Sequence, residues 1–219
     1  MKKLFYSLLM AGLTFSFTAY SEGEAVKAES QIESHRDNSA ATDSLPAGNT
    51  LIVYYSFTNN IQKIVSDLQT QIDADVLRVE PAEEGIDYAA DNYAAGSSLI
   101  SAIRENPEDA SSYPDIRTTI GNLDEYDTVI VAAPLWWSSM AAPMQTFLFK
   151  YGSQMSEKHI GLIVSSASTG ISGVEADLRR LVPDGDFIEP SLWIRSSQTS
   201  DCHSMVADWL EEIHYGASE

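Results

Sequence analysis

Cysteine and positive charge are both scarce in this sequence. Cys202 is the single cysteine in 219 residues, so no disulfide can form within one chain. The 13 lysines and arginines are outnumbered by 32 aspartates and glutamates, which gives a formal net charge of −19. Because such an acidic surface repels phosphates and anionic lipids, we expect no nucleic-acid partner. A basic partner would suit this surface, although net charge by itself also serves solubility.

Several catalytic and metal-binding motifs are missing as well. The chain has no G-x-S-x-G elbow, and His35, His159, His203 and His214 fall in places that do not suit a serine or cysteine hydrolase. No spacing of His, Cys, Asp or Glu is typical of metal ligands. A Walker A loop is also absent. We therefore predict no metal site and no acid–base catalytic residue.

The N-terminal segment has the layout of a secretory signal peptide. Lys2 and Lys3 precede an apolar run over residues 4–17, and small residues follow it. We predict a signal peptide over residues 1–21 and an exported protein, periplasmic or extracellular. The apolar run is short for a membrane span, and an uncleaved N-terminal anchor is the alternative. Residues 22–49 are polar and acidic with few bulky apolar side chains, so we predict a disordered linker before a domain over residues 50–219.

Strand-forming and helix-forming segments alternate through that domain. Apolar runs predict buried strands at residues 50–55, 76–79, 128–133 and 160–164, with a weaker strand at 191–195. Apolar spacings of three and four predict helices between them, one containing Ile61 to Ile72 and one within the long connection 82–124. Pro143 is expected to open a helix, and Ser172 with Glu175 to form a capping box. The pattern predicts an α/β fold with one parallel sheet and helices on both faces.

Ligands of such sheets bind outside the carboxyl ends of the strands, and three loops there have suitable side chains. After the first strand, Ser56, Thr58 and Asn60 offer hydroxyl and amide groups at a helix start, which favours an anion. Ordinary turn and cap residues are the alternative. After the third strand come Trp136 and Trp137. Successive side chains of a strand alternate sides, so we expect one indole at the cleft and the other toward the Pro143 helix.

Most of residues 50–213 resembles the flavodoxin-like FMN proteins. The resemblance lies in YYSFTNN, in YDTVIVAAPLWWSSMAAPMQTFLFKY and in SSASTGISGVEADLRRLVP. Ser56-x-Thr58-x-Asn60 is similar to the phosphate loop of that family, with Asn59 in place of its Gly and Ile61 in place of its last Thr. The resemblance implies a doubly wound five-stranded sheet in the order 2-1-3-4-5.

The resemblance also implies a set of FMN-binding residues. Ser56, Thr58, Asn59 and Asn60 would hold the phosphate. Pro134, Leu135, Trp136, Trp137 and Ser138 would wrap one edge of the flavin, with Trp136 expected at its face and Ser138 standing where many relatives have Gly. Ser166, Ala167, Ser168, Thr169 and Gly170 would line the other edge.

The function that the resemblance implies is an FMN-binding redox protein. It would be either an electron carrier with a basic redox partner or a small flavin-dependent reductase with a small quinone-like substrate. The two differ in whether the ring edge stays open or lies in a substrate cavity, and the connection 82–124 is long enough to cover that edge. The alternative is a non-redox binding or scaffold protein that has the fold but has lost FMN.

Overall fold

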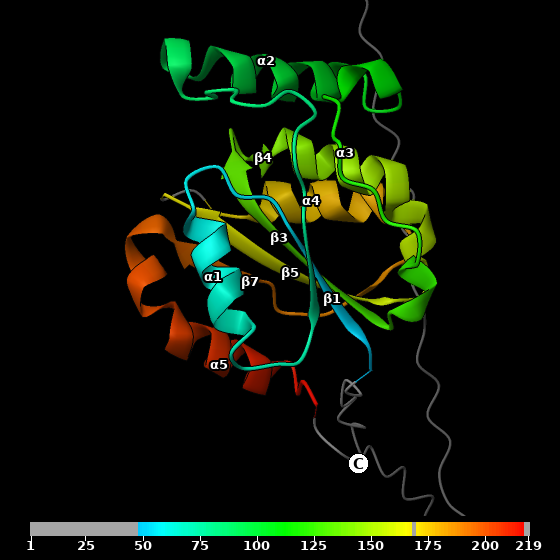
Figure 1. Ribbon diagram of the computed structural model, residues 1–219, viewed down its shortest axis with the longest axis vertical. Helices are drawn as coiled ribbons and strands as arrows, with labels where there is room; N and C mark the ends of the chain where they lie inside the picture. The colour runs from blue at the N-terminus through cyan, green and yellow to red at the C-terminus, as the bar shows by residue number, and fades with distance from the viewer. Residues whose placement is uncertain (1–47, 168–169, 217–219) are drawn as a thin grey trace, which may run out of the picture. The chain divides into compact units, whose positions relative to one another are not determined.

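A central parallel sheet organises the part of the chain that the computed structural model describes, residues 48–167 and 170–216 (Figure 1). From one edge of the sheet, the first four strands are β2 (Asp75–Arg78), β1 (Thr50–Tyr54), β3 (Thr128–Trp136) and β5 (His159–Ser166). At the far edge, β6 (Asp186–Phe187) and β7 (Leu192–Arg195) pair with successive parts of β5. If β6 and β7 are taken as one edge position, this is the predicted order 2-1-3-4-5.

The central strands are buried on both faces, as their continuous apolar sequences predict. All five residues of β1 are buried, and so are Thr128 to Ala133 of β3. Alternate residues enter different cores, because side chains of a strand alternate sides. Val53 and Val131 belong to one cluster of buried residues, whereas Ile52 and Ile130 belong to the other.

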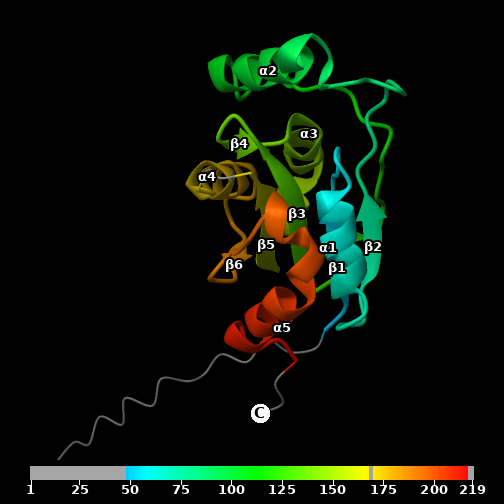
Figure 2. The same cartoon turned by 90° about the vertical axis from the view of Figure 1, so that its left-hand side faces the viewer.

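Helices cover each face of the sheet (Figures 1 and 2). On one face lie α1 (Asn60–Leu68) and α5 (Cys202–Glu212), which contact each other. On the other face lie α3 (Ala142–Tyr151) and α4 (Ser172–Leu181). The connection between β2 and β3 contains the predicted helix, α2 (Ala90–Glu105), which packs outside α3 through Ile100 and Ile103. Short 3₁₀ segments occupy Ala110–Ser112, Leu123–Glu125, Gly152–Met155 and Ser196–Asp201.

Several local predictions need correction. β3 continues to Trp136 and then turns back into β4 (Ser139–Met140), which pairs antiparallel with its end. The first half of the predicted loop is therefore strand, and β5 likewise extends through Ser166. Ile72 lies beyond the end of α1. The predicted capping box is wrong, because Ser172 is already helical and Ile171 at the cap position makes no side-chain bond.

Two predictions concern the chain before the sheet. The predicted signal peptide and nearly all of the predicted linker lie outside the described residues.

Within residues 48–167 and 170–216, no helix combines the length and the apolar character that crossing a bilayer requires. The same residues contain no group of three or more His, Cys, Asp or Glu side chains arranged to hold a metal ion.

Candidate cofactor site

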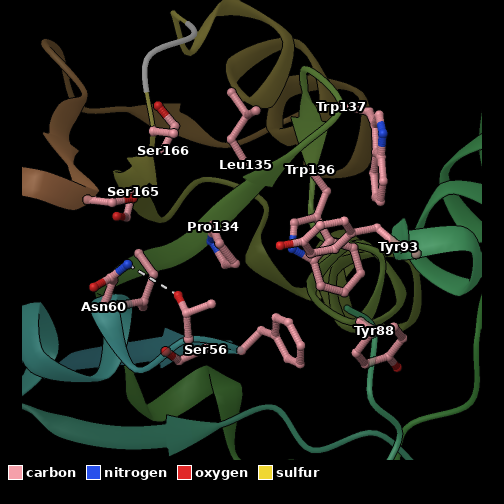
Figure 3. Close-up of a pocket in the computed structure, with 16 residues that line it drawn as sticks. Ser56, Asn60, Tyr88, Tyr93, Pro134, Leu135, Trp136, Trp137, Ser165 and Ser166 are labelled. Carbon is pink, nitrogen blue, oxygen red and sulfur yellow. Dashed lines mark hydrogen bonds between the residues drawn. The ribbon is translucent and has the colours of Figure 1, made fainter. Parts of the chain in front are cut away.

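A cavity of about 500 Å³ opens at the carboxyl ends of β1, β3 and β5 (Figure 3). This volume lies in the usual range for small-molecule sites, which is roughly 300–1,000 Å³. The cavity has two chemically different ends. Hydroxyl and amide groups from the β1 and β5 ends line one part, and aromatic rings from the β3 end and α2 line the other.

Most of the predicted site residues that the structure describes lie on this cavity wall. They come from three separate strand ends: Ser56, Thr58, Asn60, Pro134, Leu135, Trp136, Trp137, Ser166 and Ala167. Asn59, Ser138 and Gly170 are not among the lining residues. Ser168 and Thr169 lie outside the described residues. The parallel topology thus brings together segments that are far apart in the sequence.

The loop after β1 is held by its own polar side chains. Ser56 Oγ accepts a hydrogen bond from the backbone N–H of Gln62 at 3.2 Å, and Asn60 Nδ2 donates to Thr58 Oγ1 at 3.2 Å (Figure 3). Asn59 has φ 64°, in the left-handed region that Gly and Asn tolerate best. Asn can therefore supply the backbone shape for which the family motif uses Gly. Ile61 is only 1 % exposed and serves the core.

The aromatic end of the cavity is built by the β3–β4 hairpin. Its turn consists of Trp137 and Ser138, with φ 47° and 62°. Two consecutive positive φ values match the tight turns that join twisted antiparallel strands. Because the turn begins at Trp137, side chains no longer alternate between the two faces of the strand from this residue on. Both indole rings therefore line the cavity, with ring centroids 6.4 Å apart and ring planes at 78°. The prediction that only one of them would reach the cleft is wrong.

Contacts from two helices fix this hairpin. Arg104 of α2 donates to the Trp137 carbonyl and, at 2.9 Å, to Ser139 Oγ. On the other side, Asp177 of α4 accepts a hydrogen bond from the Met140 N–H at 2.9 Å. Gly173 lies so close that a Cβ there would stand 1.8 Å from the Ser138 carbonyl oxygen.

Sequence reasoning missed seven lining residues, and three of them come from α2 and the segment before it. Tyr88 packs 5.0 Å from Trp136, and Gly96 lies against both indoles. The other missed residues are Phe57, Ile61, Tyr93, Ser165 and Ser196. The available signal was the helical spacing in residues 82–124, which predicts a helix but not its place beside the cavity.

Comparisons with known proteins agree with this geometry. The sequence profile of the flavodoxin family matches residues 49–213. The chain belongs to the flavodoxin family. No curated protein matches the sequence.

Solved structures with similar folds agree with the architecture of this chain. A candidate flavoprotein from Bacteroides eggerthii has 19 % identity and a TM-score of 0.60, covering 75 % of this chain and 97 % of its own. A flavoprotein from Lactobacillus acidophilus, solved in complex with FMN, has 22 % identity and a TM-score of 0.56, covering 72 % of this chain and 99 % of its own. At these identities the likeness establishes the fold.

One of the polar groups at the β5 end is buried without a hydrogen-bond partner in the described part of the chain. Ser165 Oγ is buried in the cavity wall and has no hydrogen-bond partner among the described residues. Its neighbour Ser166 accepts a hydrogen bond from Trp193 Nε1 at 2.8 Å. A buried hydroxyl without a partner costs free energy, and this oxygen exposes almost no surface to the cavity.

The cavity wall carries no charge in the described residues. Every described lining residue is apolar, aromatic, hydroxyl-bearing or an amide. Burial raises the pKa of Tyr88 above its ordinary value, and the nearby Glu83 carboxylate adds to that effect. Burial also raises the pKa of Tyr55, whose ring meets Trp136 edge-on at 5.7 Å. These phenols therefore stay neutral at physiological pH.

Proposed function

We propose that this protein binds FMN and works as a redox protein. The observation that carries the proposal is the meeting of three strand-end segments in one cavity, with hydroxyl and amide groups at one end and tryptophans at the other. The family assignment supports the same cofactor, because its phosphate-loop and flavin-loop motifs are the segments that meet.

The phosphate would lie at the start of α1. Ser56, Thr58 and Asn60 offer hydroxyl and amide groups there, at the positive end of the α1 dipole, while the N–H of Gln62 is already bonded to Ser56 Oγ. No lysine or arginine lines the described cavity wall, so the phosphate would be held by dipoles and hydrogen bonds alone. Asn59, in its left-handed conformation, shapes the loop without lining the cavity.

The flavin ring would lie between the β3 and β5 ends. Trp136 is the half-buried indole there, and Ala167 is a small residue on the other side. Ser165 and Ser166 also lie in the cavity wall on the β5 side, beside the position proposed for the polar rim of the flavin. Bound FMN would supply electron transfer in steps of one or two electrons. The protein would orient the ring, keep water from one side of it and tune its potential.

Two partner classes follow from the surface and the cavity. The net charge of −19 suits a basic redox protein, whereas the aromatic end of the cavity suits a small quinone-like substrate. Tyr88, Tyr93 and Gly96 line the aromatic end of the cavity, and a wall there beside the proposed flavin position favours a reductase.

A titration with FMN tests the proposal. We expect the protein to quench FMN fluorescence at a stoichiometry of one and to give a yellow complex with a shifted visible spectrum. A non-redox scaffold with this fold would leave the fluorescence and the spectrum of FMN unchanged. That outcome would refute the proposal in favour of the alternative.

We also propose that the mature protein begins near Glu22 and acts outside the cytoplasm. The signal-like composition of residues 1–21 supports this. Mass spectrometry of the protein from its native cells should find a chain that lacks those residues, and an intact Met1 or Lys2 would contradict it.

A further inference from the structure

The short strand β4 has backbone groups that the sheet does not pair. In the described part of the chain β4 pairs with β3 alone, and Met140 on it is fully buried. Buried backbone N–H and C=O groups need hydrogen-bond partners. Asp177 of α4 accepts from the Met140 N–H at 2.9 Å, and Gln145 of α3 donates from Nε2 to the Met140 carbonyl at 2.7 Å. Side chains of the two helices beside β4 thus replace a neighbouring strand (Figure 2).

A single guanidinium joins the two side chains that hold Met140. Arg180 Nη2 donates to Gln145 Oε1 at 2.9 Å and to Asp177 Oδ1 at 3.3 Å. Because a guanidinium can only donate, it turns the carbonyl end of the Gln145 amide toward itself and leaves the NH₂ end for Met140. It also bonds to one carboxylate oxygen of Asp177, while the other oxygen accepts from the Met140 N–H. Arg180 therefore sets the orientation of both groups.

This hydrogen-bond network is poorly exposed to water. Gln145 is 1 % exposed, and the side chains of Asp177 and Arg180 are 16 % and 29 % exposed. Arg180 Nη1 also donates to the Tyr113 hydroxyl at 3.0 Å, which donates in turn to the Pro107 carbonyl at 2.7 Å. Charge-assisted bonds are stronger than neutral ones, and low exposure strengthens them further. Loss of the guanidinium would leave acceptors on both helices without their donor.

Met140 stands opposite residues that face the cavity. Leu135 is its antiparallel partner on β3, and Trp136 pairs with Ser139 next to it. Leu135 and Trp136 both line the cavity. A two-stranded hairpin has little stability of its own, so its position depends on what packs and bonds around it. A shift of Met140 would therefore also move the wall of the cavity.

We propose that Arg180 is a positioning residue for the flavin: through Asp177 and Gln145 it fixes the hairpin that carries Trp136. The flavin part of this inference rests on the proposed function, whereas the hairpin part rests on the hydrogen bonds. Arg180 is not among the residues that line the cavity, so its effect on FMN is indirect. Arg104 holds the turn of the same hairpin from α2, and Arg180 holds its base from α4.

The test replaces Arg180 with Met and measures two quantities. The first is hydrogen exchange of the Met140 amide in the FMN-free protein, which we expect to become about tenfold faster because Asp177 loses its orientation. The second is FMN affinity, which should fall by about tenfold. Arg180→Lys keeps the charge but lacks the planar fork of donors. It should restore FMN affinity to within about threefold of the parent.

A double-mutant cycle tests whether Arg180 acts through Asp177. An asparagine at position 177 can accept from the Met140 N–H only by turning its NH₂ group toward the guanidinium, so Asp177→Asn should weaken FMN by about tenfold in the parent. In Arg180→Met the same change should weaken FMN by less than about twofold. Additive losses, about a hundredfold in the double variant, would overturn the inference. If Arg180→Met does not fold, unchanged exchange and affinity in Arg180→Lys and Asp177→Asn would overturn it instead.

Two controls separate positioning from loss of stability. Arg179→Met removes the neighbouring guanidinium, which pairs with Glu189 at the surface and lies over the Phe187 ring, and it should change neither quantity. Val206→Ala removes buried contacts of α5 on the opposite face of the sheet. It should lower the urea midpoint but leave FMN affinity unchanged. If Arg180→Met matches Val206→Ala in both quantities, Arg180 serves stability alone and the inference is wrong.

Failure of the proposed function would give a different result. If the parent binds no FMN, the proposed function fails, and exchange of the Met140 amide still decides the role of Arg180 in the hairpin. Faster exchange in Arg180→Met than in Val206→Ala supports that role, and equal exchange overturns it. If FMN binds the parent and Arg180→Met equally well, the inference fails and the proposed function stands.

Discussion

Arg104 on α2 donates hydrogen bonds to the carbonyl of Trp137 and to the hydroxyl of Ser139, on the hairpin that ends β3. A helix outside the main layers thus holds the turn that carries an indole of the cavity. The turn needs such support, because Trp137 and Ser138 both have positive φ without being Gly. Because α2 also carries Tyr93 and Gly96, movement of this helix would change the hairpin and the cavity together.

Replacing Arg104 with Met removes these hydrogen bonds but retains much of the aliphatic stem. We expect the free energy of unfolding to fall by about 1–3 kcal/mol, since hydrogen bonds to charged groups are worth roughly this much. FMN affinity should fall by up to about tenfold, because the hairpin loses its orientation. Urea unfolding and FMN titration measure the two effects. Arg117→Met is the control, because Arg117 makes exposed ion pairs with Glu80 and Glu84, whose contribution should be small.

Gly173 should tolerate no side chain, although it lies in a helix. In most helices Gly→Ala stabilises by up to about 1 kcal/mol. Here the added Cβ would overlap the Ser138 carbonyl oxygen at 1.8 Å, so backbone would have to move. We expect Gly173→Ala to destabilise by about 1–3 kcal/mol, the usual cost of overpacking. Gly121→Ala, which meets no atom within 4 Å, is the control in urea unfolding. A stabilised Gly173→Ala protein would contradict the close contact.

The fold could be predicted from the sequence because its signals are local and repeated. Continuous apolar runs such as that of β1, and spacings such as Ile61, Ile64 and Leu68, identify elements without knowledge of their neighbours. The parallel topology then brings the strand ends together, so Ser56, Trp136 and Ser166 could be assigned to one site in advance.

The missed features depend on contacts between distant segments. Nothing in the sequence around Gly96 indicates that two indoles lie against it, since Pro134 to Trp137 follow about forty residues later. The hairpin was also missed, because Trp137-Ser138 lacks the Asn-Gly or Asp-Gly signature of such turns. It forms with residues of poor local preference, and Arg104, Gly173 and Asp177 contact it from outside.

Thr58→Ala should distinguish FMN from riboflavin. Thr58 is exposed and its hydroxyl bonds to Asn60, so its loss should hardly change stability. If Thr58 holds the phosphate, FMN affinity should fall by about 1–3 kcal/mol, the cost of leaving a partner unpaired. Riboflavin lacks the phosphate and should bind the variant and the parent alike. Thr70→Ala, at the far end of α1, is the control. Equal losses for both ligands would show that this loop does not contact phosphate.

Trp136 and Trp137 should respond differently to truncation. Trp136 is half-buried and meets Tyr55, Phe57 and Tyr88, whereas Trp137 is 42 % exposed. Trp136→Ala should lower the free energy of unfolding by about 3 kcal/mol. It should also weaken FMN binding by about 1–3 kcal/mol of binding free energy. Trp137→Ala should cost less than about 1 kcal/mol of stability, because little of its contact area is lost. Urea unfolding and FMN titration of both variants check this. Equal losses in both measurements would mean that the two rings act as one unit.

Tyr88→Phe should stabilise the protein and flatten its alkaline unfolding profile. The Tyr88 hydroxyl is buried and has no hydrogen-bond partner in the described part of the chain, so removing it should raise the free energy of unfolding by about 1 kcal/mol at neutral pH.

Burial raises the pKa of Tyr88 above its ordinary 10.0. As the pH rises past that value, the unfolded chain loses the phenol proton while the folded chain retains it, so the free energy of unfolding falls. The variant lacks this group, and its stability should fall less between about pH 10 and 11. Tyr55, Tyr126 and Cys202, whose pKa values are also raised, contribute equally to the parent and the variant. Urea unfolding at pH 7, 10 and 11 measures both effects, with Tyr151→Phe, whose ring packs on Phe147, as the control. Lower stability of Tyr88→Phe at pH 7 would show that the hydroxyl has a partner after all.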